Sequence, residues 1–243
     1  GAMTADWGDV QPNDDFGCDM NDLSDPAIDV YDNAMFIIAL DYLLEMAPDS
    51  PQASRWKSLR EGIERNVRAH LWDVKRQKFI PHIYPEKSPI PEGFDELAIH
   101  YHGGTAIAIE AGLLSKDEIR TVNAQMLENV RLSGMPSIGL TLYPVYPDGF
   151  FHGGMSKAYL YQNGGDWTWF GGRMIQQLVV NGMVEEAYAE IHPMIERVIQ
   201  NNGFYEWYGK GGIPSGSGNF KGSAGVLSKA IELLRDWAEK NKS

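Results

Sequence analysis

The chain has a single cysteine, Cys18, among its 243 residues. This excludes an internal disulfide and any multi-cysteine metal site, so packing alone must hold the fold together. Apolar runs are short, and none approaches the roughly 18 residues that a membrane-spanning helix needs. Basic residues are also scarce, with 21 Lys and Arg against 33 Asp and Glu and a formal net charge of -12. Such a charge repels phosphate backbones and anionic lipids, so neither nucleic acid nor a membrane is an expected partner.

Strand-type alternation is nearly absent, and apolar residues recur instead at helical spacing in seven segments. These segments are 26–46, 52–72, 95–114, 116–132, 167–181, 183–201 and 219–239. The first, third and fifth are apolar nearly all round, as buried helices are, and the seventh has a broad apolar face. The second, fourth and sixth carry a single apolar stripe. The sequence therefore predicts an all-α fold of antiparallel helical hairpins in an inner and an outer layer.

The connections between these segments alternate in length. Each inner helix is joined to the following outer helix by a short turn, as in antiparallel hairpins. The outer-to-inner connections are long, and most of the Gly, Pro, Trp and isolated acidic residues lie in them and in the segment before the first helix. These stretches are 4–25, 73–94, 133–166 and 202–218. They should emerge at one end of the array, where we expect the functional site.

The first three residues, Gly1-Ala2-Met3, resemble the remnant of a protease-cleaved expression tag. We therefore treat 4–243 as the protein, and its length suits one domain with a sizeable core. Because a native leader could have been removed with the tag, both a cytoplasmic and a periplasmic location stay open.

Two aromatic-rich loops, each with a carboxylate, are the features of the sequence that indicate function most directly. The first reads Tyr161-Gln162-Asn163-Gly164-Gly165-Asp166-Trp167, and the second reads Gly203-Phe204-Tyr205-Glu206-Trp207-Tyr208. Aromatic rings stack on the faces of sugar rings, and acids beside them can cleave glycosidic bonds. The loops predict carbohydrate chemistry on a small neutral sugar, without a metal or another cofactor.

The layered hairpin repeat resembles the (α/α)6 barrel of the six-hairpin glycosidases, and the resemblance is sharpest over 161–231. The first loop is similar to the Tyr-His-Asn-Gly-Gly-x-Trp motif of alkaline/neutral invertases and to the Asn-Gly-Pro-x-Trp motif of processing-α-glucosidase relatives. Residues 204–208 stand where those enzymes have Pro-Glu-Tyr-Tyr or Glu-Asn-Tyr, and a similar Phe220-x-Gly-Ser-Ala follows. A complete barrel has twelve helices. With seven, this chain would be the C-terminal part of a barrel or a shortened relative.

The resemblance implies an inverting glycoside hydrolase in which Glu206 is the general base. For the general acid the residues leave alternatives open: Asp6 and Asp9, in Asp6-Trp7-Gly8-Asp9, are candidates, and an acid upstream of the chain is an equal alternative. Asp166 is a third candidate, although it could instead cap the helix that follows. The expected sugar-contacting residues are Trp7, His152, Tyr161, Gln162, Asn163, Gly164, Gly165, Trp167, Tyr205, Trp207 and Tyr208.

Carbohydrate phosphorylases and some polysaccharide lyases share the hairpin toroid, so the reaction type is inferred from the two loop motifs and not from the fold. The shortage of helices keeps a second class of function open. The chain could be a non-catalytic sugar-binding or assembly fragment of a larger toroid enzyme. An open arc of seven helices would leave apolar surface for a second copy or for a missing N-terminal half to cover. His100 and His102, at i and i+2 of the segment 95–114, would point in different directions on a helix and make a poor metal pair.

Overall fold

The computed structural model describes residues 3–4, 11–12 and 21–242. Seven α-helices lie within these residues: α1 (Val30–Met46), α2 (Ala53–His70), α3 (His102–Glu110), α4 (Lys116–Ser133), α5 (Thr168–Val180), α6 (Val184–Asn201) and α7 (Lys221–Lys240). Three antiparallel pairs of short strands accompany them: β1 (Trp72–Asp73) with β2 (Lys78–Phe79), β3 (His100–Tyr101) with β4 (Leu142–Tyr143), and β5 (Trp207–Tyr208) with β6 (Pro214–Ser215). Short 3-10 turns are η1 (Glu96–Ala98), η2 (Gly153–Met155) and η3 (Lys210–Gly212). The predicted all-α class is confirmed.

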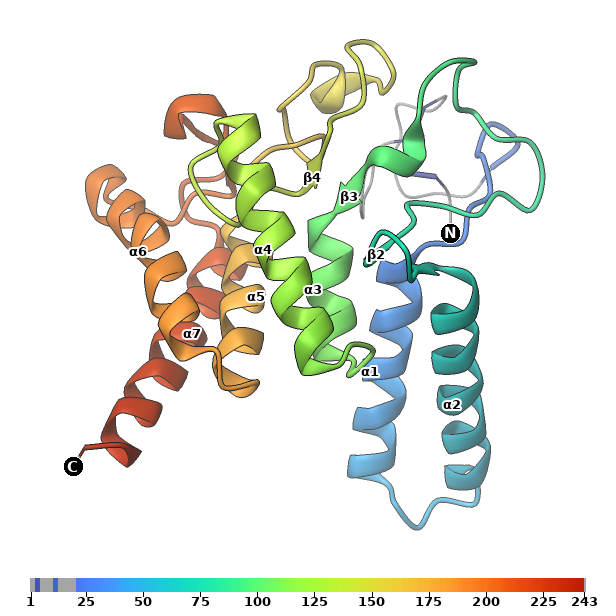
Figure 1. Ribbon diagram of the computed structural model, residues 1–243, viewed down its shortest axis with the longest axis horizontal. Helices are drawn as coiled ribbons and strands as arrows, with labels where there is room; N and C mark the ends of the chain where they lie inside the picture. Colours follow the sequence, from blue (N-terminus) through green and yellow to red (C-terminus); the bar gives the residue numbers. More distant parts are fainter. Residues whose placement is uncertain (1–2, 5–10, 13–20, 243) are drawn as a thin grey trace.

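The helices form two layers, as the alternation of apolar faces predicts. The inner helices pack in chain order, α1 against α3, α3 against α5 and α5 against α7. Of the outer helices, α2 packs on α1, and α6 packs on α5 and α7. Figure 1 shows the result as an arc of antiparallel hairpins with α1 and α7 at opposite ends. The arrangement is a toroid of hairpins that is open between α1 and α7.

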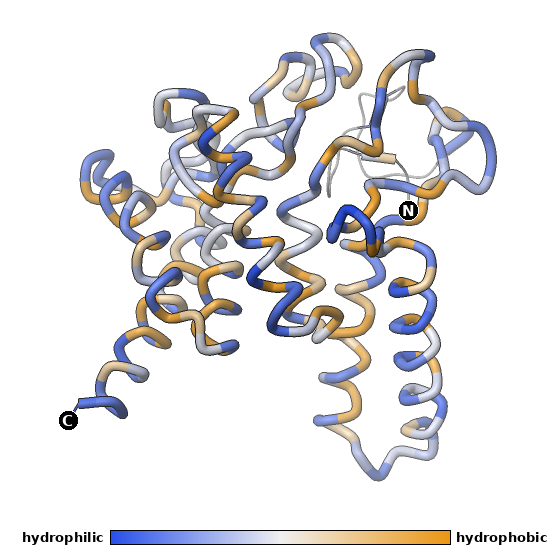
Figure 2. The backbone as a smooth tube through the Cα atoms, viewed as in Figure 1, coloured by the Kyte–Doolittle hydropathy of each residue, from blue (hydrophilic) through white to orange (hydrophobic). Residues whose placement is uncertain are grey.

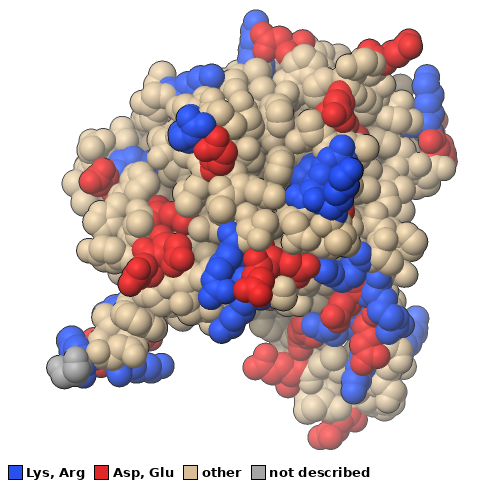
Figure 3. All heavy atoms as spheres, viewed as in Figure 1, with Lys and Arg blue, Asp and Glu red and all other residues tan. Residues whose placement is uncertain are grey.

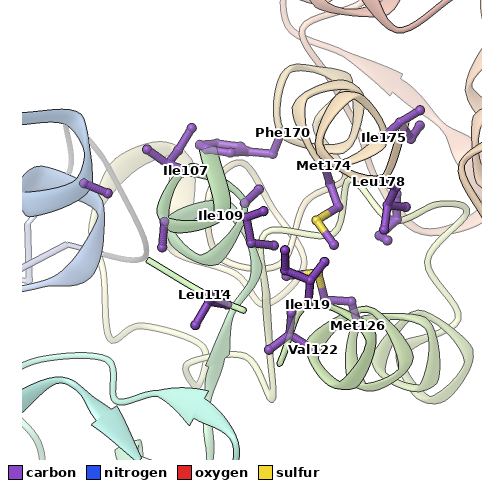
Figure 4. Close-up of a cluster of buried hydrophobic side chains, with 14 of the residues drawn as sticks. Ile107, Ile109, Leu114, Ile119, Val122, Met126, Phe170, Met174, Ile175 and Leu178 are labelled. Atoms are coloured by element: carbon purple, nitrogen blue, oxygen red, sulfur yellow. The ribbon is translucent and has the colours of Figure 1, made fainter. Parts of the chain in front are cut away.

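The buried centre of the arc joins α3, α4 and α5. Ile109 of α3 and Met174 of α5 point toward Ile119 of α4, whereas Ile107 lies beside Phe170 (Figure 4). Figure 2 shows the same division along the chain, with α1 largely orange and α2 largely blue on its outer side. Truncating one of these buried side chains to alanine typically costs about 2–5 kcal/mol, so this layer contributes strongly to the stability of the fold.

Helix ends follow local signals in the sequence. Ser115 and Glu118 form a reciprocal capping box at the start of α4, and Gly134 ends that helix in the left-handed conformation with φ 71°. At the start of α1, the Asp29 carboxylate accepts a hydrogen bond of 2.8 Å from the Asp32 backbone amide. These caps satisfy amides and carbonyls that a helix end leaves without partners.

The prediction of one helix over 95–114 is wrong in its first third. Residues 96–98 form a 3-10 turn, His100 and Tyr101 pair with Tyr143 and Leu142, and α3 begins only at His102. The cause is a tertiary contact: the amide of His102 donates to the Thr141 carbonyl at 2.8 Å, and no local pattern encodes that partner. His100 and His102 consequently do not share a helix, so the expectation that both lie on one helix is also wrong.

The long connections lie together at one end of the molecule, where the outer helices end and the inner helices begin; it is the upper end in Figure 1 and is called the loop end below. The short turns between α1 and α2, α3 and α4, and α5 and α6 lie at the opposite end. No helix in the described part of the chain has the length and apolar character to cross a membrane.

Candidate functional site

The conformation of the loop 161–167, called the motif loop below, is held by the side chain of its asparagine. Asn163 is fully buried, and its side chain exchanges two hydrogen bonds with the backbone of Tyr146: its Oδ1 accepts from the amide at 2.9 Å, and its Nδ2 donates to the carbonyl at 3.1 Å. Gly164 follows with φ 86°, and a Cβ at this position would clash with the side chain of Val145. The Asn-Gly pair therefore sets the path of the loop, since only glycine adopts this backbone conformation at low cost.

The aromatic residues of the two loops form one cluster. Trp167 donates from its indole Nε1 to the Tyr161 carbonyl at 3.0 Å, and the rings of these two residues lie 5.0 Å apart. The Tyr161 ring is 6.3 Å from that of Trp207, and the Trp167 ring is 6.1 Å from that of Phe220. Gly165 lies against this cluster, where a Cβ would be 3.2 Å from the Trp207 ring and would clash with the Tyr161 carbonyl. The second glycine of the motif thus allows the rings to approach.

Backbone pairing holds the two loops side by side. The Asp166 amide donates to the Tyr208 carbonyl at 2.9 Å, and the Tyr208 amide donates to the Asp166 carbonyl at 2.8 Å. Tyr208 is fully buried, with the Arg197 guanidinium 4.0 Å from the centre of its ring. The structure therefore brings together the two motifs that are about forty residues apart in the sequence.

The Asp166 side chain is buried in an ion pair. One of its oxygens lies 2.8 Å from Arg197 Nη1, and Ser137 Oγ lies 2.8 and 2.7 Å from the two carboxylate oxygens. Arg197 also donates to Thr168 Oγ1 at 2.6 Å, and the relative exposure of Asp166 is 0%. Asp166 does not cap α5, whose N-cap is Trp167. In this geometry the Asp166 carboxylate links α6 to the start of α5 through Arg197, and it has no exposed surface from which to donate a proton to a substrate.

Glu206 lies at the entrance to the β5–β6 hairpin and is partly exposed. Its amide donates to the Ser217 carbonyl at 2.9 Å, and its carboxylate Oε2 accepts from the Ser217 amide at 3.1 Å. Gly216, with φ 68°, passes so close that a Cβ would clash with Oε2. The other oxygen, Oε1, has no hydrogen-bond donor among the described residues. One oxygen therefore orients the carboxylate while the other remains available to a water molecule or a ligand.

The remaining predicted contact residues fall into exposed and buried groups. Tyr161, Tyr205 and Trp207 are partly exposed at the loop end, and His152 is exposed just before η2. Trp167 and Gln162 are buried, with relative exposures of 4% and 2%. The candidates Asp6, Trp7 and Asp9 lie outside the described residues.

A polar cluster that is not evident from the sequence supports the motif loop. Glu96 Oε1 accepts hydrogen bonds from the hydroxyls of Tyr84 at 2.7 Å and Tyr146 at 2.8 Å, and it lies 2.8 Å from His82 Nδ1. The Tyr146 hydroxyl also meets that of Tyr101 at 2.7 Å. Burial and the neighbouring Glu96 carboxylate raise the pKa of Tyr84, so its hydroxyl stays protonated as a donor.

This cluster matters for the site because Tyr146 also binds Asn163 through its backbone. It links the connection after β2 to the motif loop. The sequence did not indicate this polar cluster, because Glu96 falls in the segment that the apolar pattern assigned to a helix.

No family model and no curated protein sequence matches the chain. Its fold is similar to that of the GH63 mannosylglycerate hydrolase from Thermus thermophilus in complex with Tris and D-glycerate, with a TM-score of 0.59 and 17% sequence identity over 86% of this chain. The complex of that hydrolase with glucose gives a TM-score of 0.59 at 15% identity, and an uncharacterized conserved protein from the same organism gives 0.60 at 16%. The chain spans less than half of these proteins, 46% to 48% of their length.

At these identities the similarity establishes the fold. The chain has the helical fold found in a glycoside hydrolase, and its two aromatic loops lie together at one end of that fold.

Proposed function

We propose that the chain contributes the general base and an aromatic wall to an inverting glycoside hydrolase site for a neutral, gluco-type sugar. The observation that carries the proposal is the position of Glu206, a partly exposed carboxylate with one oriented and one free oxygen, directly before Trp207 in the aromatic cluster. The similarity in fold to a mannosylglycerate hydrolase, one of whose structures contains glucose, supports the same class of reaction.

In the proposed reaction, Glu206 takes a proton from the water that attacks the anomeric carbon. The bond between that carbon and the glycosidic oxygen breaks as the new bond to water forms on the opposite face, which inverts the configuration. A second carboxylic acid, about 6.5–9.5 Å away, protonates the leaving oxygen. Asp9 or Asp6 would supply this proton if the acid belongs to the chain, because Asp166 is held in its ion pair with Arg197.

The sugar would be held by the exposed members of the cluster, Tyr161, Tyr205 and Trp207. Their rings offer apolar faces for the C–H groups of a pyranose, and the acidic surface disfavours anionic sugars. The buried members Asn163, Gly164, Gly165 and Trp167 would act indirectly, by fixing the position of these rings.

The alternative is a non-catalytic carbohydrate-binding or assembly fragment of a larger toroid. Two observations favour it: the chain spans less than half of the matched structures, and α1, which is largely apolar, carries exposed apolar side chains at the open end of the arc. Phe36 of α1 is 47% exposed and Met46 is 73% exposed. In this case a second copy or the remainder of a toroid would cover that face, and sugars would bind without being cleaved.

Hydrolysis followed by NMR distinguishes the two functions. The chain is incubated with a panel of α- and β-glucosides, disaccharides and mannosylglycerate, and the anomeric proton of the first product is recorded before mutarotation. We expect release of the anomer opposite to that of the substrate. Product with retained configuration contradicts the inverting mechanism. Sugar binding without any product supports the alternative.

Replacing Trp207 by alanine should weaken sugar binding. The ring is partly exposed and meets the Tyr161 ring edge-on. Its loss should cost about tenfold or more in sugar affinity, as loss of an aromatic stacking partner for a sugar does. Calorimetric titration with the sugars of the panel measures this, beside circular dichroism to check folding. Trp237→Ala is the matched control, because Trp237 is also partly exposed, at 44%, but lies near the end of α7. Equal affinity in both variants would place the sugar elsewhere.

A further inference from the structure

A groove of about 870 Å3 lies on the outer layer, bordered by the β1–β2 hairpin, by residues 97–100 and by α4. Three of its lining residues are cations, Arg76, Lys78 and Arg120, whereas Glu128 is its single acidic lining residue. On this face a blue patch occupies the place where the β1–β2 connection lies in Figure 1 (Figure 3). A basic groove is unexpected on a chain with a net charge of -12.

Lys78 is the unusual group in the groove. It is 3% exposed, and its ammonium donates to the carbonyl of Ile99. Within the described residues no carboxylate lies within ion-pair distance of it. A lysine ammonium has three N–H donors, so two of them have no partner among the described residues. A buried charge without an ion-pair partner is costly, and burial and the charge of Arg76 lower the pKa of Lys78 to about 8.

The other polar groups of the groove can turn toward an anion at little cost. Arg76 pairs with Asp73 at 3.1 Å and Arg120 pairs with Asp117 at 2.8 Å, and both pairs are at the surface, where such contacts contribute little. Burial and the charge of Lys78 lower the pKa of His100 to about 4, so this ring is neutral and can donate a hydrogen bond. Gln125 of α4 holds the hairpin in place by donating to the Arg76 carbonyl at 3.0 Å.

We propose that this groove binds a small oxyanion, a carboxylate or phosphate group, with Lys78 as the buried cationic contact and Arg76 and Arg120 as its rim. An anion would supply the opposite charge that Lys78 lacks and the acceptors for its two free N–H groups. The groove shares no residue with the candidate sugar site, so anion binding here does not depend on the glycosidase function.

Calorimetric titration of the whole chain with sodium phosphate and, separately, sodium acetate tests this at constant ionic strength. We expect saturable binding of at least one, and the tighter of the two identifies the preferred oxyanion. Lys78→Met, which keeps the length of the side chain without its charge, should lower the affinity at least about tenfold. Lys157→Met removes an exposed lysine that pairs with Asp148 at the loop end and should leave the affinity unchanged.

A second variant covers the case in which Lys78→Met fails to fold by circular dichroism. Arg76→Gln combined with Arg120→Gln changes only exposed side chains and should weaken binding about five- to tenfold. Saturable binding of neither anion at tens of millimolar would overturn the proposal. So would an unchanged affinity in Lys78→Met or, if that variant is unfolded, in the double variant.

Proton linkage gives an independent readout of Lys78. Burial and the charge of Arg76 lower the pKa of this group to about 8, against the opposing charges of Asp73, Asp95 and Glu96, so near pH 9 the free protein has largely lost the proton. A bound anion favours the ammonium form, so binding there should take up about one proton. Titrating with sulfate, which does not itself protonate, in buffers of different ionisation enthalpy measures the uptake. Sulfate binding without proton uptake would contradict the role of Lys78.

Discussion

Replacing Glu206 by glutamine is expected to lower the turnover of glycoside hydrolysis by about two to four orders of magnitude, the usual contribution of a general base. Glutamine keeps the size of the side chain and can still accept the hydrogen bond from the Ser217 amide, so folding and sugar binding should change little. Steady-state kinetics on the best substrate of the panel measure the effect, with sugar affinity determined separately by calorimetry.

Glu86→Gln is the matched control, because Glu86 is an exposed glutamate in the long connection after β2. It should leave turnover unaltered. If the acid belongs to the chain, Asp9→Asn or Asp6→Asn should be as slow as Glu206→Gln. Normal hydrolysis by Glu206→Gln would remove this residue from the mechanism.

The second large effect concerns stability. Replacing Arg197 by methionine should lower the free energy of unfolding by about 3–5 kcal/mol, because it leaves the Asp166 carboxylate buried without its partner. The methionine keeps much of the apolar stem, so the effect reports the lost charge and hydrogen bonds. Urea unfolding followed by circular dichroism gives the value.

Two further variants separate the ion pair from packing. Arg197→Met combined with Asp166→Leu removes both charges and should regain a large part of the lost stability, since replacing a whole buried pair is often nearly neutral. Arg131→Met breaks an exposed pair with Glu128 and should have a much smaller effect. A double variant less stable than Arg197→Met alone would contradict the assignment of Asp166 as a structural ion-pair partner.

The hydrogen-bond network explains why these two effects differ in kind. Asp166 and Glu206 are the acids of the two loops, and from the sequence both are catalytic candidates. Their surroundings separate them, because Asp166 meets Arg197 and Ser137 in the interior while Glu206 keeps one free oxygen at the surface. Neither Arg197 nor Ser137 stands in either aromatic loop, so no pattern in those loops could assign the two acids.

In the motif loop, too, the structure gives a residue a different role from the one that the sequence suggests. From the sequence, Asn163 is expected among the sugar-contacting residues, but its side chain is occupied by the Tyr146 backbone and has no exposed surface. Tyr146 itself is held by Glu96, which the apolar pattern placed within a helix. The loop therefore depends on three segments of the chain that meet only in the folded protein.

By itself the sequence determined the helical class, the two layers and the loop end. Apolar spacing repeats within a few residues, and helix hydrogen bonds join residues four apart, so these features are local. Even the start of α4 could be read locally, since its cap and its first turn lie within four residues.

Only the tertiary structure decided what each polar side chain does. The start of α3 at His102 depends on Thr141, and the burial of Asp166 depends on Arg197. Lys78 is buried without an ion-pair partner because folding leaves every described carboxylate beyond ion-pair distance of it. A buried polar group takes its role from partners that are tens of residues away, and their distance in space is set by the packing of whole helices.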